Sequence, residues 1–444
     1  MQKRVVDELE SLDAALGQTV SRAVKKLPLD TAEPARAEES IAAKRRRRGK
    51  PPPGQLATVG LVRSDGVLRW TYQRPPNRVG PRRTRFRAAR MVGARPIVEF
   101  SFQEVPPNEV IRKLQELDDS LTPNQGLRRW QGGVLAPIDQ PAATARALLV
   151  VHGTFSKGET LFDELQSTPA GKAFLAAAES QYKQVLAFDH PTLAVSPVLN
   201  ALDLERALGG YKGDVDIVCH SRGGLVAAWW LRTGLRNVKR VICVGAPLEG
   251  TSLAAPARIK QTLDYCANVA NAIETAAKVA GGFVPPIAPL LGMTAGLMGV
   301  LGGALSLGAR TPLVDAGVAI IPGLAAQSRV ENNQELLRLQ RDTWPSQPEI
   351  YAIRSDFEPG DPDAKWWEFW RRWNRPLLKL ADTAADRIFN EPNDLVVDLK
   401  TMVRAGTPLP ANQVYSFPTN GRVHHCNYFA QPETIDRFRK WLKL

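Results

Sequence analysis

Residues 215–230 read Val-Asp-Ile-Val-Cys-His-Ser-Arg-Gly-Gly-Leu-Val-Ala-Ala-Trp-Trp, and the prediction of the fold starts from this stretch. A short β-branched run predicts a strand leading to Ser221, and the apolar run after it, ended by Gly234, predicts a helix. A serine at such a turn is typical of a nucleophile elbow, in which a strained backbone exposes the hydroxyl above the sheet. The turn needs small neighbours: Gly223 is one, and Cys219 stands where a glycine is usual. The other interpretation is a serine that caps an ordinary helix.

The composition bounds the class of protein. The chain has 444 residues, of which 44% are hydrophobic, so it can bury a large core and is long for one domain. Its 4 cysteines are scattered without a Cys-x-x-Cys pair, which is typical of a reducing compartment rather than of a disulfide framework. The first residues run straight into charged helical sequence, without the apolar segment of a secretory signal. We therefore expect a cytoplasmic protein, either free or peripheral to a membrane.

The basic character of the chain is local. The formal net charge of +13 comes largely from residues 44–50 and from the arginines between residues 74 and 95. Both runs lie among prolines and glycines and outside the stretch around Ser221, which is typical of a solvated linker and a basic face. Nucleic acid is therefore not the expected partner. Contact with an anionic membrane is the alternative that the charge leaves open.

The chain divides into four expected parts. Residues 1–30 carry apolar side chains at alternating spacings of three and four, which predicts an amphipathic helix that could dock on a protein partner. Residues 31–55 are rich in Pro, Arg, Glu and Ala and predict a flexible basic linker. In residues 56–140, short alternating runs predict a β-rich module or an antiparallel extension of the main sheet. The main domain is expected over residues 141–444.

In the main domain, apolar runs of strand length alternate with helical patterns, which predicts a doubly wound, mostly parallel α/β sheet. The first run, Ala147–Val151, is continuous, as in strands that are buried on both faces. Ligands of such sheets bind beyond the carboxyl ends of the strands. The other expected strands are 185–188, 215–219, 241–244 and 350–354, and the expected helices are 160–181, 197–208 and the one after Ser221.

All five histidines fall at predicted strand ends or in the loops that follow, which indicates a site at one rim of the sheet. Acyl transfer requires a nucleophile, a base that takes its proton, and a carboxylate that orients the base. Ser221 is the candidate nucleophile. The base is expected after the last strand, 414–417, where His425 is favoured and His424 is the alternative.

Two aspartates compete for the role of the triad carboxylate. Asp394 is favoured because it stands in a loop that leads into a short apolar run. Asp356, after the strand 350–354, is the alternative. Either choice gives the order Ser, Asp, His along the chain, which serine hydrolases built on wound sheets use.

Backbone N–H groups are expected to stabilise the oxyanion of the reaction. One is that of Arg222, directly after the nucleophile, and the other is that of Thr154, in the turn after the first strand, with Phe155 as the alternative. The chemistry requires no metal and no organic cofactor. The residues expected to contact the substrate are His152, Gly153 and His220.

Five motifs together resemble the α/β-hydrolase superfamily of serine hydrolases. The run at residues 245–254, Gly-Ala-Pro-x-x-Gly-x-Ser-Leu-Ala, is similar to lipases and lecithin:cholesterol-acyltransferase-like enzymes. The resemblance covers about residues 145–444. It implies the α/β-hydrolase fold and serine hydrolysis, and the lipase-like run implies a lipid substrate. The motifs are His152-Gly153-Thr154, residues 219–224, residues 245–254, residues 393–397 and His425.

Two insertions interrupt the predicted hydrolase domain. The first, residues 253–345, contains an uncharged run at 279–309 that is long enough for a membrane span. Its glycines and its return to the sheet favour instead an apolar cap or lid over the site. The second, residues 357–390, carries tryptophans beside arginines, a composition typical of a membrane interface or of a helix packed on the cap.

Three functions are consistent with these patterns. The favoured one is a serine hydrolase that cleaves acyl esters, with a lipase or phospholipase as the expected type. An acyltransferase or thioesterase with the same triad would differ only in the acceptor. A non-catalytic membrane-binding assembly module would instead use the amphipathic helix, the basic runs and the apolar insertion.

Overall fold

The computed structural model describes the main domain most fully. The helix expected in residues 1–30, most of the basic linker, most of the lid insertion and nearly all of the second insertion lie outside the described residues. The described residues are 31–32, 57–64, 67–73, 96–102, 110–233, 237–254, 296–297, 321–329, 333–341, 348–357 and 392–444.

A small antiparallel sheet forms from the N-terminal region. Its strands have the order β1-β4-β2-β3, and three of them correspond to the alternating runs of residues 56–140. β1 falls within the expected linker, where its two residues pair with β4. The strands are β1 (Thr31–Ala32), β2 (Ala57–Ser64), β3 (Val67–Gln73) and β4 (Pro96–Phe102).

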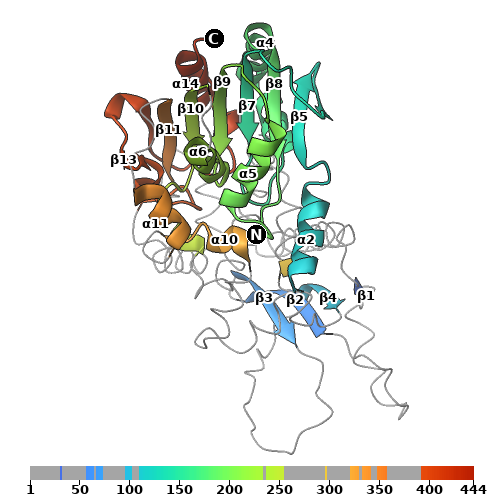
Figure 1. The fold of residues 1–444 in the computed structure, drawn as a ribbon. Helices are drawn as coiled ribbons and strands as arrows, with labels where there is room; N and C mark the ends of the chain where they lie inside the picture. Colours follow the sequence, from blue (N-terminus) through green and yellow to red (C-terminus); the bar gives the residue numbers. More distant parts are fainter. Residues whose placement is uncertain are drawn as a thin grey trace, which may run out of the picture.

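The main sheet has eight strands in the order β14-β11-β10-β9-β7-β8-β5-β6 (Figure 1). The strands from β14 to β8 are mutually parallel, whereas β5 runs antiparallel to both β8 and β6. The sheet is therefore mixed, and residues 126–137 extend it at one edge. Its strands are β5 (Gly126–Gln131), β6 (Val134–Pro137), β7 (Ala147–Val151), β8 (Gln184–Asp189), β9 (Val215–His220), β10 (Val238–Val244), β11 (Glu349–Phe357) and β14 (Val414–Asn420).

Helices cover both faces of this sheet (Figure 1). One face carries α3 (Gly158–Gln166), α4 (Pro169–Gln181) and α14 (Pro432–Leu442). The other carries α5 (Pro197–Ala207), α6 (Gly223–Thr233) and α11 (Gln334–Arg341). The remaining elements are α2 (Val110–Leu121), α10 (Pro322–Ala325), η3 (Ser252–Ala254), η6 (Leu399–Met402), β12 (Arg404–Ala405), β13 (Thr407–Pro408), η7 (Ala411–Gln413) and η8 (Tyr428–Ala430).

The single helix expected at 160–181 was wrong, because the chain forms α3 and α4 there. Thr168 takes extended dihedral angles and caps α4 by accepting a hydrogen bond from the Gly171 N–H at 3.1 Å. Pro169 follows as the first residue of α4, where it lacks an N–H that could continue the preceding helix.

β7 shows why a continuous apolar run is needed at the centre of the sheet. Leu148 and Val150 pack with α3 and α4, whereas Leu149 and Val151 pack with α5 and α6. Because side chains alternate along a strand, a strand covered by helices on both sides must be apolar at every position. Burial of each such side chain contributes about 1.5–3 kcal/mol.

The chain reverses its direction of winding at β7. It passes from β7 to β8 on one side, and then returns through α5 to β9 on the other side of β7. The carboxyl ends of β7 and β9 therefore border a topological switch point, the usual position of a ligand crevice in wound sheets. The turn at residues 152–155 and Ser221 both follow these strand ends.

Candidate active site

Ser221 occupies the turn between β9 and α6 and has a φ of 53°, in the left-handed region. A non-glycine residue there stores about 1–3 kcal/mol of strain, which the surrounding contacts must offset. The Ser221 N–H donates to the Val244 carbonyl at 2.9 Å. A Cβ at Gly223 would overlap the Val151 carbonyl oxygen, so only glycine fits there. The geometry is that of a strained strand-to-helix turn rather than of an ordinary helix cap.

Cys219, which replaces the usual glycine, is accommodated within the core. Its side chain is buried, and its Sγ lies 3.7 Å from the Sγ of Cys243 on the adjacent strand β10. The turn also packs closely at Gly224, where a Cβ would come within 2.5 Å of the Ala246 Cβ. The thiol therefore leaves the turn undisturbed.

Asp394 and His425 form a hydrogen bond of 2.8 Å between Oδ2 and Nδ1. The same carboxylate oxygen accepts from the Tyr428 hydroxyl at 2.9 Å, and Oδ1 accepts from the N–H groups of Val396 and Val397 at 3.1 and 2.8 Å. Asp394 is 0% exposed. These donors hold the carboxylate in place, and its bond to Nδ1 holds the His425 tautomer that carries its proton on Nδ1, which leaves Nε2 as the base.

The loop that holds Asp394 is built by its own polar side chains. Asn393 Oδ1 accepts from the Leu395 N–H at 2.9 Å, and Leu395 has a φ of 81°. The His425 N–H donates to the Asp394 carbonyl at 3.0 Å. These Asx-type bonds make the loop adopt a fixed shape that carries both members of the pair.

His220 supports the pair from the side of the serine. Its Nε2 lies 2.9 Å from the His425 carbonyl oxygen, and its ring centroid lies 4.8 Å from that of His425. A carbonyl only accepts hydrogen bonds, so His220 donates through Nε2. Burial, together with the neighbouring His425, lowers the pKa of His220 to about 3, so it is neutral at physiological pH.

The serine turn and the Asp394–His425 pair meet at the end of β10. A Cβ at Gly245 would lie 3.1 Å from Asp394 Oδ2 and 3.2 Å from His425 Nδ1, and the preceding Val244 accepts the Ser221 N–H. Ser221 Oγ and His425 Nε2 form no hydrogen bond with each other in this structure. Within the described part of the chain neither atom has another partner, so both are free for a substrate.

The two alternatives, His424 and Asp356, lie in other contacts. The His424 ring accepts the Cys426 N–H at 3.2 Å and meets Phe357 edge-on at 5.9 Å. Burial lowers the pKa of His424 to about 4. Asp356 accepts the hydroxyl of Thr419 at 2.7 Å. Neither residue takes part in a carboxylate–imidazole hydrogen bond in the described regions.

The turn after β7 contacts the serine directly, since a Cβ at Gly153 would lie 2.7 Å from the Ser221 Cβ. The Phe155 N–H donates to Thr192 Oγ1 at 3.4 Å, and Phe155 has a φ of 57°. The N–H groups of Thr154 and Arg222 have no partner among the described residues. Those two groups are therefore free donors on either side of the turn.

His152 acts as a support for this turn. It is fully buried, its Nδ1 donates to the Gly153 carbonyl at 2.9 Å, and its Nε2 accepts the His190 N–H at 3.1 Å. Its ring also stacks on that of His190 at 4.1 Å. Burial lowers the pKa of His152. Both ring nitrogens are thus occupied by the protein.

The Arg222 side chain is 0% exposed, and its Nη2 donates to the Val195 carbonyl at 2.6 Å and to Asn200 Oδ1 at 2.7 Å. Burial lowers the pKa of Arg222 to about 10, so it stays charged at neutral pH. From the residue types, only the backbone of Arg222 was predicted to take part in the site, and neither Tyr428 nor Asp118 of α2 was predicted. An aspartate in an amphipathic helix and a tyrosine near a histidine are too common to signal a site.

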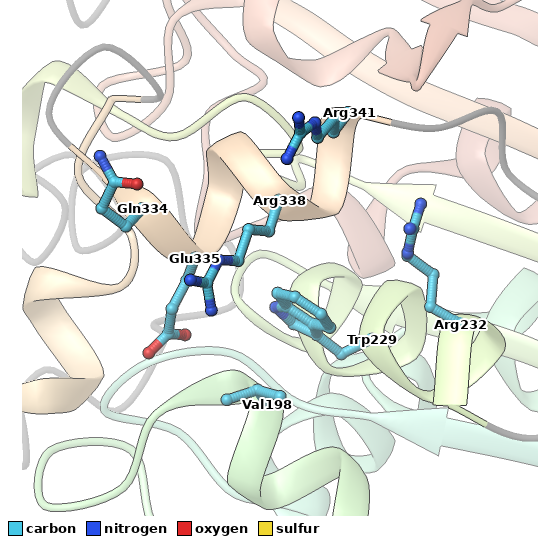
Figure 2. Close-up of a pocket in the computed structure, with 7 residues that line it drawn as sticks. All are labelled: Val198, Trp229, Arg232, Gln334, Glu335, Arg338 and Arg341. Atoms are coloured by element: carbon cyan, nitrogen blue, oxygen red, sulfur yellow. The ribbon is translucent and has the colours of Figure 1, made fainter.

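A separate cavity of about 560 Å³ lies between α5, α6 and α11 (Figure 2). Figure 2 shows Trp229 between the side chains of Arg232 and Arg338. The cavity contains no member of the Asp394–His425 pair and no serine, so it is distinct from the site around Ser221. Its lining residues are Val198, Trp229, Arg232, Gln334, Glu335, Arg338 and Arg341.

The described residues contain no group of three or more His, Cys, Asp or Glu residues that could hold a metal ion. Nor does any of the described helices combine the length and the apolar character needed to cross a bilayer.

The fold and site define a wound α/β protein with a mixed central sheet, flanking helices, and a strained serine turn at its switch point. The chain belongs to the family described as Domain of unknown function (DUF7379), whose model matches residues 120–443. No curated protein matches the sequence.

Among solved structures, the chain is similar to the mature lipase BlEst2 of Bacillus licheniformis, at 15% identity and a TM-score of 0.34, over 69% of this chain and 95% of the other. It is also similar to olei00960, a hydrolase from Oleispira antarctica, at 11% identity and a TM-score of 0.37, over 72% and 95% of the two chains. A thermophilic esterase from Thermogutta terrifontis matches at 13% identity and a TM-score of 0.35, over 68% and 91%.

Proposed function

We propose that the protein is a serine hydrolase that cleaves carboxylic esters, with Ser221 as nucleophile, His425 as general base and Asp394 as the orienting carboxylate. The observation that carries the proposal is the buried Asp394–His425 hydrogen bond of 2.8 Å, held at the end of β10 next to the strained Ser221 turn. A buried carboxylate that orients an imidazole beside an unpartnered serine hydroxyl is the arrangement that nucleophilic acyl transfer needs.

The reaction begins when Ser221 Oγ attacks the ester carbonyl and its proton passes to His425 Nε2. Asp394 stabilises the imidazolium through its hydrogen bond to Nδ1. The hydrogen bond between Oγ and Nε2 forms as the substrate binds, since catalytic hydrogen bonds are often long in the free enzyme. The tetrahedral oxyanion accepts hydrogen bonds from the N–H groups of Thr154 and Arg222, which have no partner in the described part of the protein.

Collapse of this intermediate breaks the ester bond, and the imidazolium returns its proton to the leaving alcohol. Water then attacks the acyl-enzyme with His425 again as base, and the carboxylic acid leaves with the serine restored. We propose a lipid ester, as for a lipase or phospholipase, because the run at 279–309 is uncharged, the composition expected of an apolar cap over a lipid-binding site. A thioesterase or acyltransferase would use the same acyl-enzyme and differ in the leaving group or the acceptor.

Covalent labelling tests the nucleophile. We expect a fluorophosphonate to add one adduct to the full-length protein, on the peptide that contains Ser221, and the adduct to be absent in Ser221→Ala. Ser416→Ala is the matched control, because Ser416 lies exposed on β14 and, among the described residues, its hydroxyl bonds only to Arg354. An unlabelled wild type, or labelling retained in Ser221→Ala, would contradict the proposal.

The substrate class is tested next. Hydrolysis of p-nitrophenyl esters of increasing chain length ranks short esters against lipid-like ones. Mass spectrometry of a total lipid extract, incubated with wild type or Ser221→Ala, then identifies the released acid. If the wild-type protein prefers acetate esters to long-chain esters and leaves the lipid extract unchanged, the proposal of an ester hydrolase stands and the proposal of a lipase is excluded.

A further inference from the structure

Helix α2 precedes the main sheet and buries one carboxylate against the loop that follows β8. Asp118 is 0% exposed and lies on α2 just before residue 120, where the family match begins. Nothing in the proposed reaction uses this residue. Since burial of an unpaired carboxylate is costly, its partners show what it does.

The partners of Asp118 are three consecutive backbone N–H groups. Oδ1 accepts from Thr192 at 2.7 Å and from Leu193 at 2.9 Å, and Oδ2 accepts from Ala194 at 2.7 Å. Burial raises the pKa of Asp118, while the three N–H bonds and the charge of Arg222 act in the opposite direction. The carboxylate therefore fixes the backbone of residues 192–194 as a bound anion would.

Thr192 transmits this restraint to the turn after β7. Its Oγ1 lies 3.4 Å from Asp118 Oδ1 and accepts the Phe155 N–H at 3.4 Å. That bond occupies the Phe155 N–H, whereas the neighbouring Thr154 N–H has no partner among the described residues. Phe155 has a left-handed backbone conformation, which is costly for a residue other than glycine. The hydrogen bond to Thr192 helps to hold it there.

Arg222 is attached to the same loop from the other side. Its guanidinium donates to the Val195 carbonyl at 2.6 Å, one residue beyond the segment that Asp118 holds. The backbone N–H of Arg222, beside Ser221, likewise has no partner in the part of the chain that the structure describes. Both free donors are therefore connected, through Thr192 and Val195, to one short loop.

We propose that Asp118 is a positioning residue that holds the N–H groups of Thr154 and Arg222 in the orientation the oxyanion requires. The functional unit then begins in α2, upstream of the residues that the family match covers. The catalytic consequence rests on the proposed function. The positioning of the two backbone segments does not, and it is measured separately.

The first experiment is hydrogen–deuterium exchange on the full-length protein, read by mass spectrometry. Asp118→Asn is expected to accelerate exchange in peptides covering residues 153–155 and 192–195. The side-chain NH₂ of the asparagine cannot accept the hydrogen bonds from backbone N–H groups that the carboxylate accepts. Peptides of β10 should be unchanged. The matched control is Asp119→Asn, on the exposed side of α2, whose carboxylate accepts a hydrogen bond from Gln125 at 2.8 Å and from no other described side chain. Unchanged exchange at 153–155 in Asp118→Asn would overturn the proposal, whether or not the protein hydrolyses esters.

The second experiment separates positioning from general stability. In Asp118→Asn we expect kcat to fall by about 10–100-fold with KM within about three-fold of wild type. Misplaced donors stabilise the oxyanion of the transition state less well, whereas they contribute little to binding of the substrate. Thr192→Val, which loses the hydroxyl, should show part of the fall in kcat expected for Asp118→Asn. Thr192→Ser, which keeps the hydroxyl, should have the kcat of wild type. Equal loss in Thr192→Val and Thr192→Ser, or wild-type kcat in Asp118→Asn, would assign Asp118 a purely structural role.

Discussion

Asp394 and Asp118 are both completely buried, and both accept backbone N–H groups. Asp394 lies beside Gly245 at the end of β10, and Asp118 lies against the loop that follows β8. They differ in one partner. Asp394 also contacts an imidazole, at 2.8 Å, whereas Asp118 contacts backbone and one threonine hydroxyl. A buried carboxylate that contacts a titratable base can change the chemistry of that base, and one that contacts backbone amides and a hydroxyl can change where those groups point.

The largest effect is expected from the carboxylate that contacts the base. Asp394→Asn should lower kcat by about 10³–10⁴-fold, because an amide favours the wrong imidazole tautomer. Hydrolysis of a p-nitrophenyl ester measures it, and circular dichroism checks the fold. Asp356→Asn, the matched control on β11, should stay within about three-fold of wild type. An Asp394→Asn variant that loses no more than Asp118→Asn would remove the distinction between the two carboxylates.

Tyr428→Phe should have a smaller effect on the same carboxylate. The hydroxyl donates to Asp394 Oδ2 at 2.9 Å, and burial next to Asp394 raises the pKa of Tyr428. Its loss leaves Asp394 with its imidazole and two N–H partners. We expect kcat to fall by about 10-fold, as is usual for the loss of a group that orients a catalytic residue. Wild-type kcat in this variant would mean that the backbone alone holds Asp394.

A third buried carboxylate, Glu164 on α3, extends the comparison. It accepts the Ala430 N–H at 3.0 Å, and burial raises its pKa from 4.5 to about 8. Between these pH values the folded state keeps a proton that the unfolded chain has lost. The free energy of unfolding should therefore fall as the pH rises from about 4.5 to about 8 and then level off.

Glu164→Gln should remove that component of the pH dependence, which is on the order of a few kcal/mol. Urea unfolding at pH 5 and pH 8.5 measures it for wild type and variant. Asp163→Asn, a neighbour on α3 with a less buried carboxyl, is the control. A pH dependence that is the same in Glu164→Gln and wild type would show that Glu164 is ionised in the folded protein.

The smallest effect is expected at the second histidine. His424→Gln should keep kcat within about three-fold, because its ring bonds to the Cys426 N–H and packs on Phe357 rather than on a carboxylate. His425→Gln should lose activity by at least as much as Asp394→Asn. Steady-state kinetics of the two variants decides between the neighbouring imidazoles, and the opposite ranking would reassign the base.

Much of the framework was predictable because it depends on local patterns. The apolar run of β7 and the strand-to-helix turn at Ser221 require few residues, and each pattern has a direct physical cause. The helix 160–181 was mispredicted because its apolar spacing continues across Thr168 and Pro169, where a cap and a missing N–H divide it. The assignment of residues 126–137 to the main sheet also needed coordinates, since strand partners far apart in the chain leave no local trace.

The order of strands and helices, the strained serine and the candidate histidines can be read from residue types in neighbouring positions. The choice of Asp394 as the partner of His425 is a matter of tertiary contact, because 31 residues separate the two side chains. The position of Asp118 is also decided by tertiary contact, because 74 residues separate it from Thr192 in the loop that it holds. Hydrogen bonds between distant segments depend on how the elements pack, and packing is a property of the whole folded chain.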